Sequence, residues 1–208
     1  MKQFTIDNSQ LTIKILTLFL ILSIVHFQFS IPVFAADQDP VGYSRIHPAS
    51  PLYFLKTIRE NLELKFAATG HVKLLRQLEF AQRRLREVRT LIAINEDLIP
   101  PTIERYNFYI NSLNDTHKDT EELRLMQSNL ANNLKTLQLI YGQAVTPRAK
   151  MFIRSAMNRV IQRADVPNFA KVPICNLFTK ESSSSALNQT ERLVLVERAE
   201  KCRLMLMP

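Results

Sequence analysis

Apolar residues recur every three or four positions along most of the chain, and this is the period of an α-helix that buries one face. The longest run spans residues 71–94, where the apolar positions form one narrow seam that needs a partner helix. Further runs predict helices at about residues 51–68, 101–113, 119–142, 147–164 and 188–202. The seam of the 71–94 helix consists of Leu74, Leu78, Ala81, Leu85, Val88 and Ile92.

The expected ends of these helices carry capping residues. Ser50 before Pro51 predicts a helix start, because serine accepts a hydrogen bond from an early backbone N–H and proline needs no partner there. Asp119 and Asn188 are each followed three residues later by a glutamate, which is typical of a capping box. Gly70 is expected to end the first helix. That helix is expected to bury an apolar face formed by Leu52, Leu55, Ile58, Leu62 and Phe66.

Composition favours an all-α fold. Only three glycines occur in 208 residues, and valine and isoleucine seldom alternate with polar residues, which argues against a sheet-rich fold. Pro40, Gly42 and Pro48 indicate a linker at residues 36–49. We therefore predict a bundle of about five or six amphipathic helices, with its main domain at residues 50–165.

The N-terminus has the pattern of a secretory signal peptide. Ile15–Val25 is an uncharged apolar run, shorter than the roughly 20 apolar residues that a membrane span needs. Val33-Phe34-Ala35 before Ala36 fits the small-residue cleavage pattern. We predict a signal peptide at residues 1–35 and an exported, extracytoplasmic protein. An uncleaved membrane anchor and a buried N-terminal helix are the alternatives.

The formal net charge of +8 directs attention to anionic partners. Outside the cytoplasm these are lipid head groups and wall polymers, so nucleic acid is not an expected partner. The 71–94 helix is expected to carry Arg76, Glu79, Arg83, Arg86 and Glu87 on its outer side. In the 147–164 helix no acidic residue offsets the positive charge, which makes it the better candidate for binding an anionic surface; a merely solvated basic face is the alternative. The candidate residues are Arg148, Lys150, Arg154, Arg159 and Arg163.

Cys175 and Cys202 are the only two cysteines of the chain. In an exported protein an even number of cysteines favours a disulfide, and a metal site or catalytic thiol is the alternative. The bridge would close a loop of about 28 residues and stabilise the fold by roughly 3 to 4 kcal/mol. Pro173 and the serine run at 182–185 predict that residues 166–208 form a loop and one helix tethered by this disulfide. The apolar tail at 204–207 packs on the bundle or contributes to a partner interface.

Two short motifs in the first two helices carry a resemblance. Ser50–Lys56 reads S-P-L-Y-F-L-K, and Ala81–Glu87 reads A-Q-R-R-L-R-E. This pair resembles an uncharacterised family of bacterial exported helical proteins, a domain of unknown function that reads S-P-L-Y-x-L-K followed by A-x-R-R-L-x-E. The resemblance covers residues 50–94 and extends toward Tyr141. It implies a helical extracytoplasmic module and supplies no catalytic residue.

No motif in the sequence identifies a reaction, and we expect no catalytic residue, cofactor or bound metal. The sequence lacks an H-E-x-x-H pair, a glycine-rich phosphate loop and a nucleophile elbow. The densest group of possible ligands suits a weak divalent-cation site, or a hydrolase based on His117. Capping of the next helix is the simpler interpretation. The group consists of Asp115, His117, Asp119, Glu121 and Glu122.

The predicted function is therefore a non-enzymatic exported module with a structural or binding role at the cell envelope. Its partner would be an anionic envelope polymer, a lipid surface or another protein. An extracytoplasmic holdase-like chaperone is the first alternative, and it requires a contiguous exposed apolar patch. A weak divalent-metal-binding or hydrolytic protein is the second.

Overall fold

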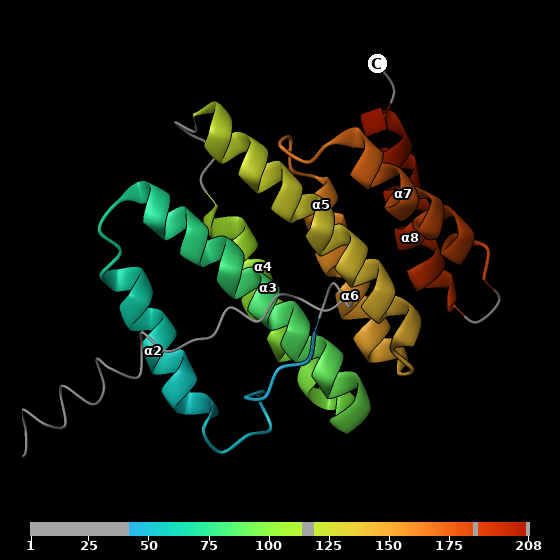
Figure 1. The fold of residues 1–208 in the computed structure, drawn as a ribbon. Coiled ribbons are helices and arrows are strands. Elements are labelled where there is room, and N and C mark those ends of the chain that lie inside the picture. Colours follow the sequence, from blue (N-terminus) through green and yellow to red (C-terminus); the bar gives the residue numbers. More distant parts are fainter. Residues whose placement is uncertain (1–41, 114–118, 185–186, 207–208) are drawn as a thin grey trace, which may run out of the picture. The chain divides into compact units, whose positions relative to one another are not determined.

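The structure is a computed structural model that describes residues 42–113, 119–184 and 187–206. Within these ranges the chain forms seven α-helices and one short 3-10 helix, with no strand (Figure 1). The all-α prediction is thus confirmed. The predicted signal peptide at 1–35 lies outside the described residues. The elements are α2 (Tyr53–Lys65), α3 (Gly70–Ile94), η1 (Glu96–Leu98), α4 (Ile99–Ser112), α5 (Thr120–Gln143), α6 (Pro147–Ile161), α7 (Asn168–Ser182) and α8 (Gln189–Leu206).

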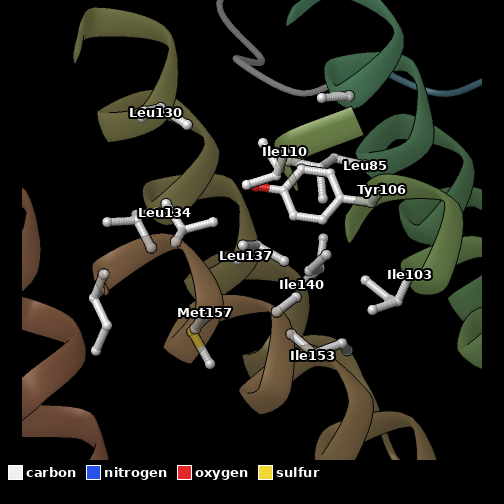
Figure 2. Packing of buried hydrophobic residues seen from close by; sticks show 14 of the residues in the cluster. Leu85, Ile103, Tyr106, Ile110, Leu130, Leu134, Leu137, Ile140, Ile153 and Met157 are labelled. Atoms are coloured by element: carbon white, nitrogen blue, oxygen red, sulfur yellow. The ribbon is translucent and has the colours of Figure 1, made fainter. Parts of the chain in front are cut away.

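The apolar core lies between α3, α4, α5 and α6, which pack against one another. Figure 2 shows Leu85 of α3, Ile110 of α4, Leu134 of α5 and Met157 of α6 pointing into this shared interior. The predicted seam of α3 is confirmed, since five of its six residues are buried and Ile92 packs partly buried against the core. Burial of these side chains provides the main driving force for folding.

The predicted caps at Asp119 and Asn188 are correct, whereas the predicted start at Ser50 and Pro51 is wrong, because α2 begins at Tyr53 and no side chain caps it. The backbone N–H of Glu122 donates to the Asp119 carboxylate over 2.7 Å, and that of Glu191 donates to the Asn188 side chain over 2.8 Å. The prediction for Gly70 is wrong, because this residue begins α3 and does not end α2. Thr69 precedes it and caps α3 by accepting from the backbone N–H of Val72. Helix α2 has already ended at Lys65.

Helix α2 is turned the opposite way from the prediction. The apolar positions predicted to be buried point outward and are 48% to 74% exposed, whereas Glu60, on the opposite side, is 2% exposed. Leu64 is the apolar residue of α2 that packs partly buried against the core. The polar side faces inward because α3 carries Arg84, a buried cation that pairs with Glu60 of α2 and with Glu87. Without these carboxylates, the buried charge of Arg84 would be uncompensated. The exposed apolar residues are Leu52, Leu55, Ile58, Leu62 and Phe66, joined by Phe54.

A further correction concerns the segment after Val166, which was expected to be a loop. Residues 168–182 form helix α7, with Pro173 on its exposed side. Proline removes one backbone donor, but it stands in the second turn, so most of the helix keeps its hydrogen bonds. Helix α7 buries Lys171, Ile174, Cys175 and Phe178, which have the spacing of one helical face.

Candidate functional site

A buried cluster of charged side chains joins α2 to α3. The Arg84 guanidinium donates to both carboxylate oxygens of Glu60 at 2.6 Å and lies 3.0 Å from Oε2 of Glu87. The Lys56 ammonium donates to the other oxygen of Glu87 at 2.6 Å. Glu60, Arg84 and Glu87 are each at most 2% exposed. Two cations and two carboxylates therefore compensate each other inside the protein, as buried charges require.

Tyr53 completes this cluster with its hydroxyl. The hydroxyl donates to Oε2 of Glu87 at 3.0 Å and accepts from the guanidinium of Arg84 and, at 3.0 Å, from that of Arg105. Burial, together with the negative charge of Glu87, raises the pKa of Tyr53 to about 12. Burial also lowers the pKa of Lys56, although Glu87 acts in the opposite direction. Tyr53 thus stays neutral at ordinary pH and serves as a hydrogen-bonding bridge.

The two sequence motifs meet in this cluster. Tyr53 and Lys56 belong to S-P-L-Y-F-L-K, while Arg84 and Glu87 belong to A-Q-R-R-L-R-E. Their side chains bond directly to one another although about 30 residues separate them. The predicted outward position of Glu87 is consequently wrong, because this residue is fully buried. Glu79 and Arg83 do form the expected outer pair, with a distance of 2.5 Å.

The outer side of α2 combines apolar and basic side chains. Phe54, Leu55 and Phe66 are more than half exposed, and Arg59 and Lys65 are exposed beside them. The carboxylates of α2 do not match this positive charge: one is buried in the cluster, and Glu63 is shared between Arg59 and a cation of α3. The result is an amphipathic surface with a slight positive charge.

A cavity of about 460 Å³ opens next to this surface. Its walls come from residues 43–46, from one side of α2 and from α3. Five basic side chains line it, together with Tyr43 and three aliphatic residues, and no acidic residue does. The basic lining residues are Arg45, Lys56, Arg59, Arg83 and Arg86.

The basic residues predicted on α6 do not form one open face. Arg154 is 5% exposed and lies 3.8 Å from Glu181 of α7, which also accepts from the hydroxyl of Tyr141. Arg163 lies just after α6, pairs with Asp165 at 2.6 Å and donates to the carbonyl oxygen of Ile110. Their charge is therefore offset, contrary to the prediction. Lys150 stacks over the Tyr141 ring, and only Arg148 and Arg159 are exposed.

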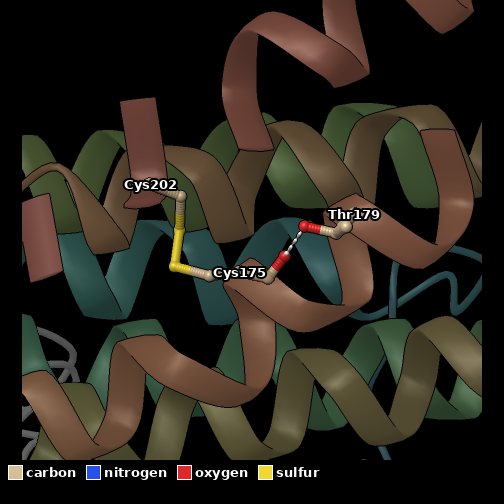
Figure 3. Close-up of a disulfide and its surroundings, with 3 residues drawn as sticks. All are labelled: Cys175, Thr179 and Cys202. Carbon is tan, nitrogen blue, oxygen red and sulfur yellow. Dashed lines mark hydrogen bonds between the residues drawn. A yellow bond between two sulfur atoms is a disulfide. The ribbon is translucent and has the colours of Figure 1, made fainter. Parts of the chain in front are cut away.

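The structure joins Cys175 of α7 to Cys202 of α8 by a disulfide (Figure 3). The Cα atoms are 5.5 Å apart, and both residues are buried. The hydroxyl of Thr179 donates to the carbonyl oxygen of Cys175 at 3.1 Å. A buried disulfide fits an oxidising compartment and gives α7 and α8 a covalent link.

Within the part of the chain that it describes, the structure does not bring further metal-binding side chains to the cation site predicted at residues 115–122. Asp115 and His117 lie outside the described residues, and Asp119 caps α5 as described above. Glu122 instead lies 2.6 Å from the His71 ring nitrogen Nδ1. In the described ranges, no group of three or more metal-binding side chains gathers at one place. Nor does any helix in these ranges have the length and apolar character to cross a bilayer.

Comparison with known proteins adds one finding. Residues 45–144 match the family model of a domain of unknown function (DUF5667). The match extends from the segment before α2 through the end of α5, so it contains both motifs, the charged cluster and all residues that line the cavity except Tyr43 and Ser44. Helices α6, α7 and α8 lie beyond it. Searches of curated proteins and of solved structures gave no match.

Sequence reasoning found the motifs but missed what they do together. One signal was present in α2 itself, since Tyr53, Lys56 and Glu60 have the spacing of a helical face. A second was the pair Arg84 and Glu87, three residues apart on α3. Both signals were polar stripes, and polar stripes are ordinarily assigned to solvent.

Proposed function

We propose that this protein is a non-enzymatic binding module of the cell envelope that attaches to an anionic membrane surface through the outer side of α2. The observation that carries the proposal is the reversed orientation of this helix. Its apolar stripe faces solvent, whereas the charged cluster holds its polar stripe against α3. A helix fixed in this way presents its apolar side chains ready to insert at a membrane interface.

The charges beside the apolar stripe favour a lipid surface over an unfolded protein. Arg59 and Lys65 flank the exposed phenylalanines, and the cavity next to them is lined by further cations. Anionic head groups attract such residues by about 1 kcal/mol for each Lys or Arg near the surface. The disulfide supports a location in the envelope, because such bonds persist in oxidising compartments.

The role as a binding module is supported by the state of the charged groups. Each carboxylate of the cluster already accepts from cations inside the protein, and the tyrosine hydroxyl is held between them. Such a cluster fixes the position of α2 and leaves no free base at its centre. We therefore assign it a structural role in presenting the outer side of the helix.

The test is co-sedimentation of the protein with vesicles of phosphatidylcholine, alone or mixed with phosphatidylglycerol. The protein is used in the form that cells produce, with its N-terminus defined by intact mass. Binding is expected only to the anionic vesicles and is expected to weaken at high salt. Phe54→Ser should reduce it about tenfold, because inserting one large apolar side chain contributes roughly 1.5 kcal/mol or more. The matched control is Phe108→Ser, which removes an equally exposed phenylalanine from α4.

Three results would contradict the membrane proposal. Equal vesicle binding by the wild type and Phe54→Ser would show that α2 does not contact the bilayer. Suppression of client-protein aggregation without vesicle binding would instead support the holdase-like chaperone, whose required exposed apolar patch the outer side of α2 also provides. A wild-type dimer that Phe54→Ser dissociates would identify a second copy of the chain as the partner.

A further inference from the structure

The cavity beside α2 has walls that the fold holds in place. The backbone N–H of Ser44 donates to the hydroxyl of Thr90 at 2.9 Å, which attaches the segment 43–46 to α3. Lys56 donates to the carbonyl oxygen of Ile46 at 3.0 Å, which attaches the same segment to α2. Because Lys56 also bonds to Glu87, the wall is connected to the buried cluster. The cavity is thus built by specific hydrogen bonds between three parts of the chain.

The charges that line the cavity are only partly compensated. Lys56, Arg59 and Arg83 each have a carboxylate partner, which is Glu87, Glu63 and Glu79 respectively. Among the residues that the structure describes, Arg45 and Arg86 line the cavity without an ion pair or a side-chain hydrogen bond.

Arg86 is the more constrained of these two cations, since it is half-buried whereas Arg45 is exposed. Burial lowers the pKa of Arg86, and the positive charge of neighbouring Arg83 lowers it further. The carboxylates of Glu79 and Glu87 offset only part of this effect. A guanidinium nevertheless stays charged in proteins. An anion at this position would offset both the lost hydration of Arg86 and the repulsion from Arg83, so the cavity favours a negatively charged occupant.

The lining of the cavity favours a phosphate group as the anion. A guanidinium fork matches the oxygen atoms of a phosphate group in geometry as well as in charge. Leu52 and Leu55 line the cavity and are also part of the outer apolar side of α2, so an apolar chain attached to the phosphate can continue along that helix. A volume of about 460 Å³ lies in the range of ordinary small-molecule sites.

We propose that the cavity between residues 43–46, α2 and α3 binds a phosphate group through Arg86 and Arg45, as the phosphodiester of an anionic phospholipid. The lipid form of this inference rests on the proposed membrane attachment, whereas recognition of phosphate itself does not. In the complex, the head group occupies the cavity and the acyl chains lie against the outer side of α2. The site would thereby convert general attraction to a charged surface into recognition of one head group.

The experiment is isothermal titration of the protein with soluble probes. These are dihexanoyl phosphatidylglycerol below its micelle concentration, dihexanoyl phosphatidylcholine and inorganic phosphate. Dihexanoyl phosphatidylglycerol is expected to bind tightest. Arg86→Gln is expected to weaken its binding about tenfold, as loss of one charge-assisted pair implies. The affinity of Arg86→Lys should lie between those of the wild type and Arg86→Gln, because lysine keeps the positive charge but lacks the forked guanidinium. The matched control is Arg124→Gln, at an exposed arginine of α5.

The probes also separate the two sources of phosphate. Inorganic phosphate that binds as tightly as the short lipid, and that Arg86→Gln abolishes, supports the site with a free phosphate as its ligand. No binding of either probe, or equal binding by the wild type and Arg86→Gln, overturns the proposal. Circular dichroism of each variant shows whether the helices remain formed.

Failure of this inference is distinguishable from failure of the membrane proposal. Vesicle binding that depends on Phe54 but not on Arg86 leaves the membrane proposal standing and removes the phosphate site. Binding of the short lipid without binding to vesicles supports the phosphate site and removes the membrane proposal.

Discussion

Helices α2 and α5 each carry one apolar and one polar stripe, but they bury opposite stripes. Helix α5 turns Leu130 and Leu134 into the core and leaves its charged residues at the surface. Helix α2 turns Glu60 toward α3 and leaves Phe54 and Leu55 at the surface. The two helices are both amphipathic, so the strength of the pattern does not explain the difference.

The difference lies in what each helix meets. Helix α5 meets α3 and α6, which offer apolar seams to it. Helix α2 meets the side of α3 that carries Arg84 and Glu87, and these two residues pair with each other and with Glu60 and Lys56 of α2. An unpaired buried charge costs more than an exposed leucine, so the polar stripe of α2 is the one that turns inward. An exposed apolar stripe is then left over, and it becomes available for function.

The largest expected effect follows from removing the shared cation of the cluster. Arg84→Met leaves Glu60 and Glu87 without their common partner, and we expect the docking of α2 to lose about 3 to 5 kcal/mol. Native-state hydrogen exchange measures this loss as faster exchange of α2 amides than of α5 amides. Lys73→Met is the matched control, because Lys73 is exposed on the same helix. Unchanged protection of α2 in Arg84→Met would refute the account of its orientation.

The disulfide provides a third way of holding a helix in place. Helix α8 buries only Leu195 and Cys202, so it relies on neither an extensive apolar nor a charged stripe. Changing both cysteines to serine should cost about 3 to 4 kcal/mol, the loop-closure entropy of a bridge between residues 27 apart. Denaturant unfolding of the oxidised protein measures the loss. Reductant should destabilise the wild type by the same amount as the double substitution and should leave the double variant unaffected. A loss of stability well below about 3 kcal/mol in the double variant would mean that packing alone holds α8.

One substitution made in both helices sharpens the comparison. Leu134→Ala on α5 creates a cavity in the core and should cost about 2 to 5 kcal/mol. Leu62→Ala on α2 removes a side chain that is 48% exposed and should change stability by about 0.5 kcal/mol or less. Denaturant midpoints compare the two variants directly. Similar losses for both would mean that the apolar stripe of α2 is buried in solution.

These contrasts explain which features could be predicted from the sequence. The α3 seam and the caps at Asp119 and Asn188 follow from local spacing, and the structure confirms them. The orientation of α2 could not be predicted, because it depends on Glu60 meeting Arg84 across 24 residues. Helix α7 was missed because Pro173 breaks the local signal, although the buried face of that helix compensates for the proline.

An effect smaller than that of the core cavity is expected for the Tyr53 hydroxyl, and it depends on pH. Tyr53→Phe removes the hydrogen bond to Glu87 and should cost about 0.5 to 1.5 kcal/mol at neutral pH. The folded pKa of Tyr53 is raised from 10.0 to about 12. The stabilisation is therefore fully present below pH 10 and is lost as the pH rises toward 12, because the unfolded chain releases the proton first. The stability difference between the wild type and Tyr53→Phe should thus shrink across this interval in thermal unfolding curves. A constant difference would mean that the hydroxyl is not buried against Glu87, and that the inner side of α2 is as open to water as its outer side.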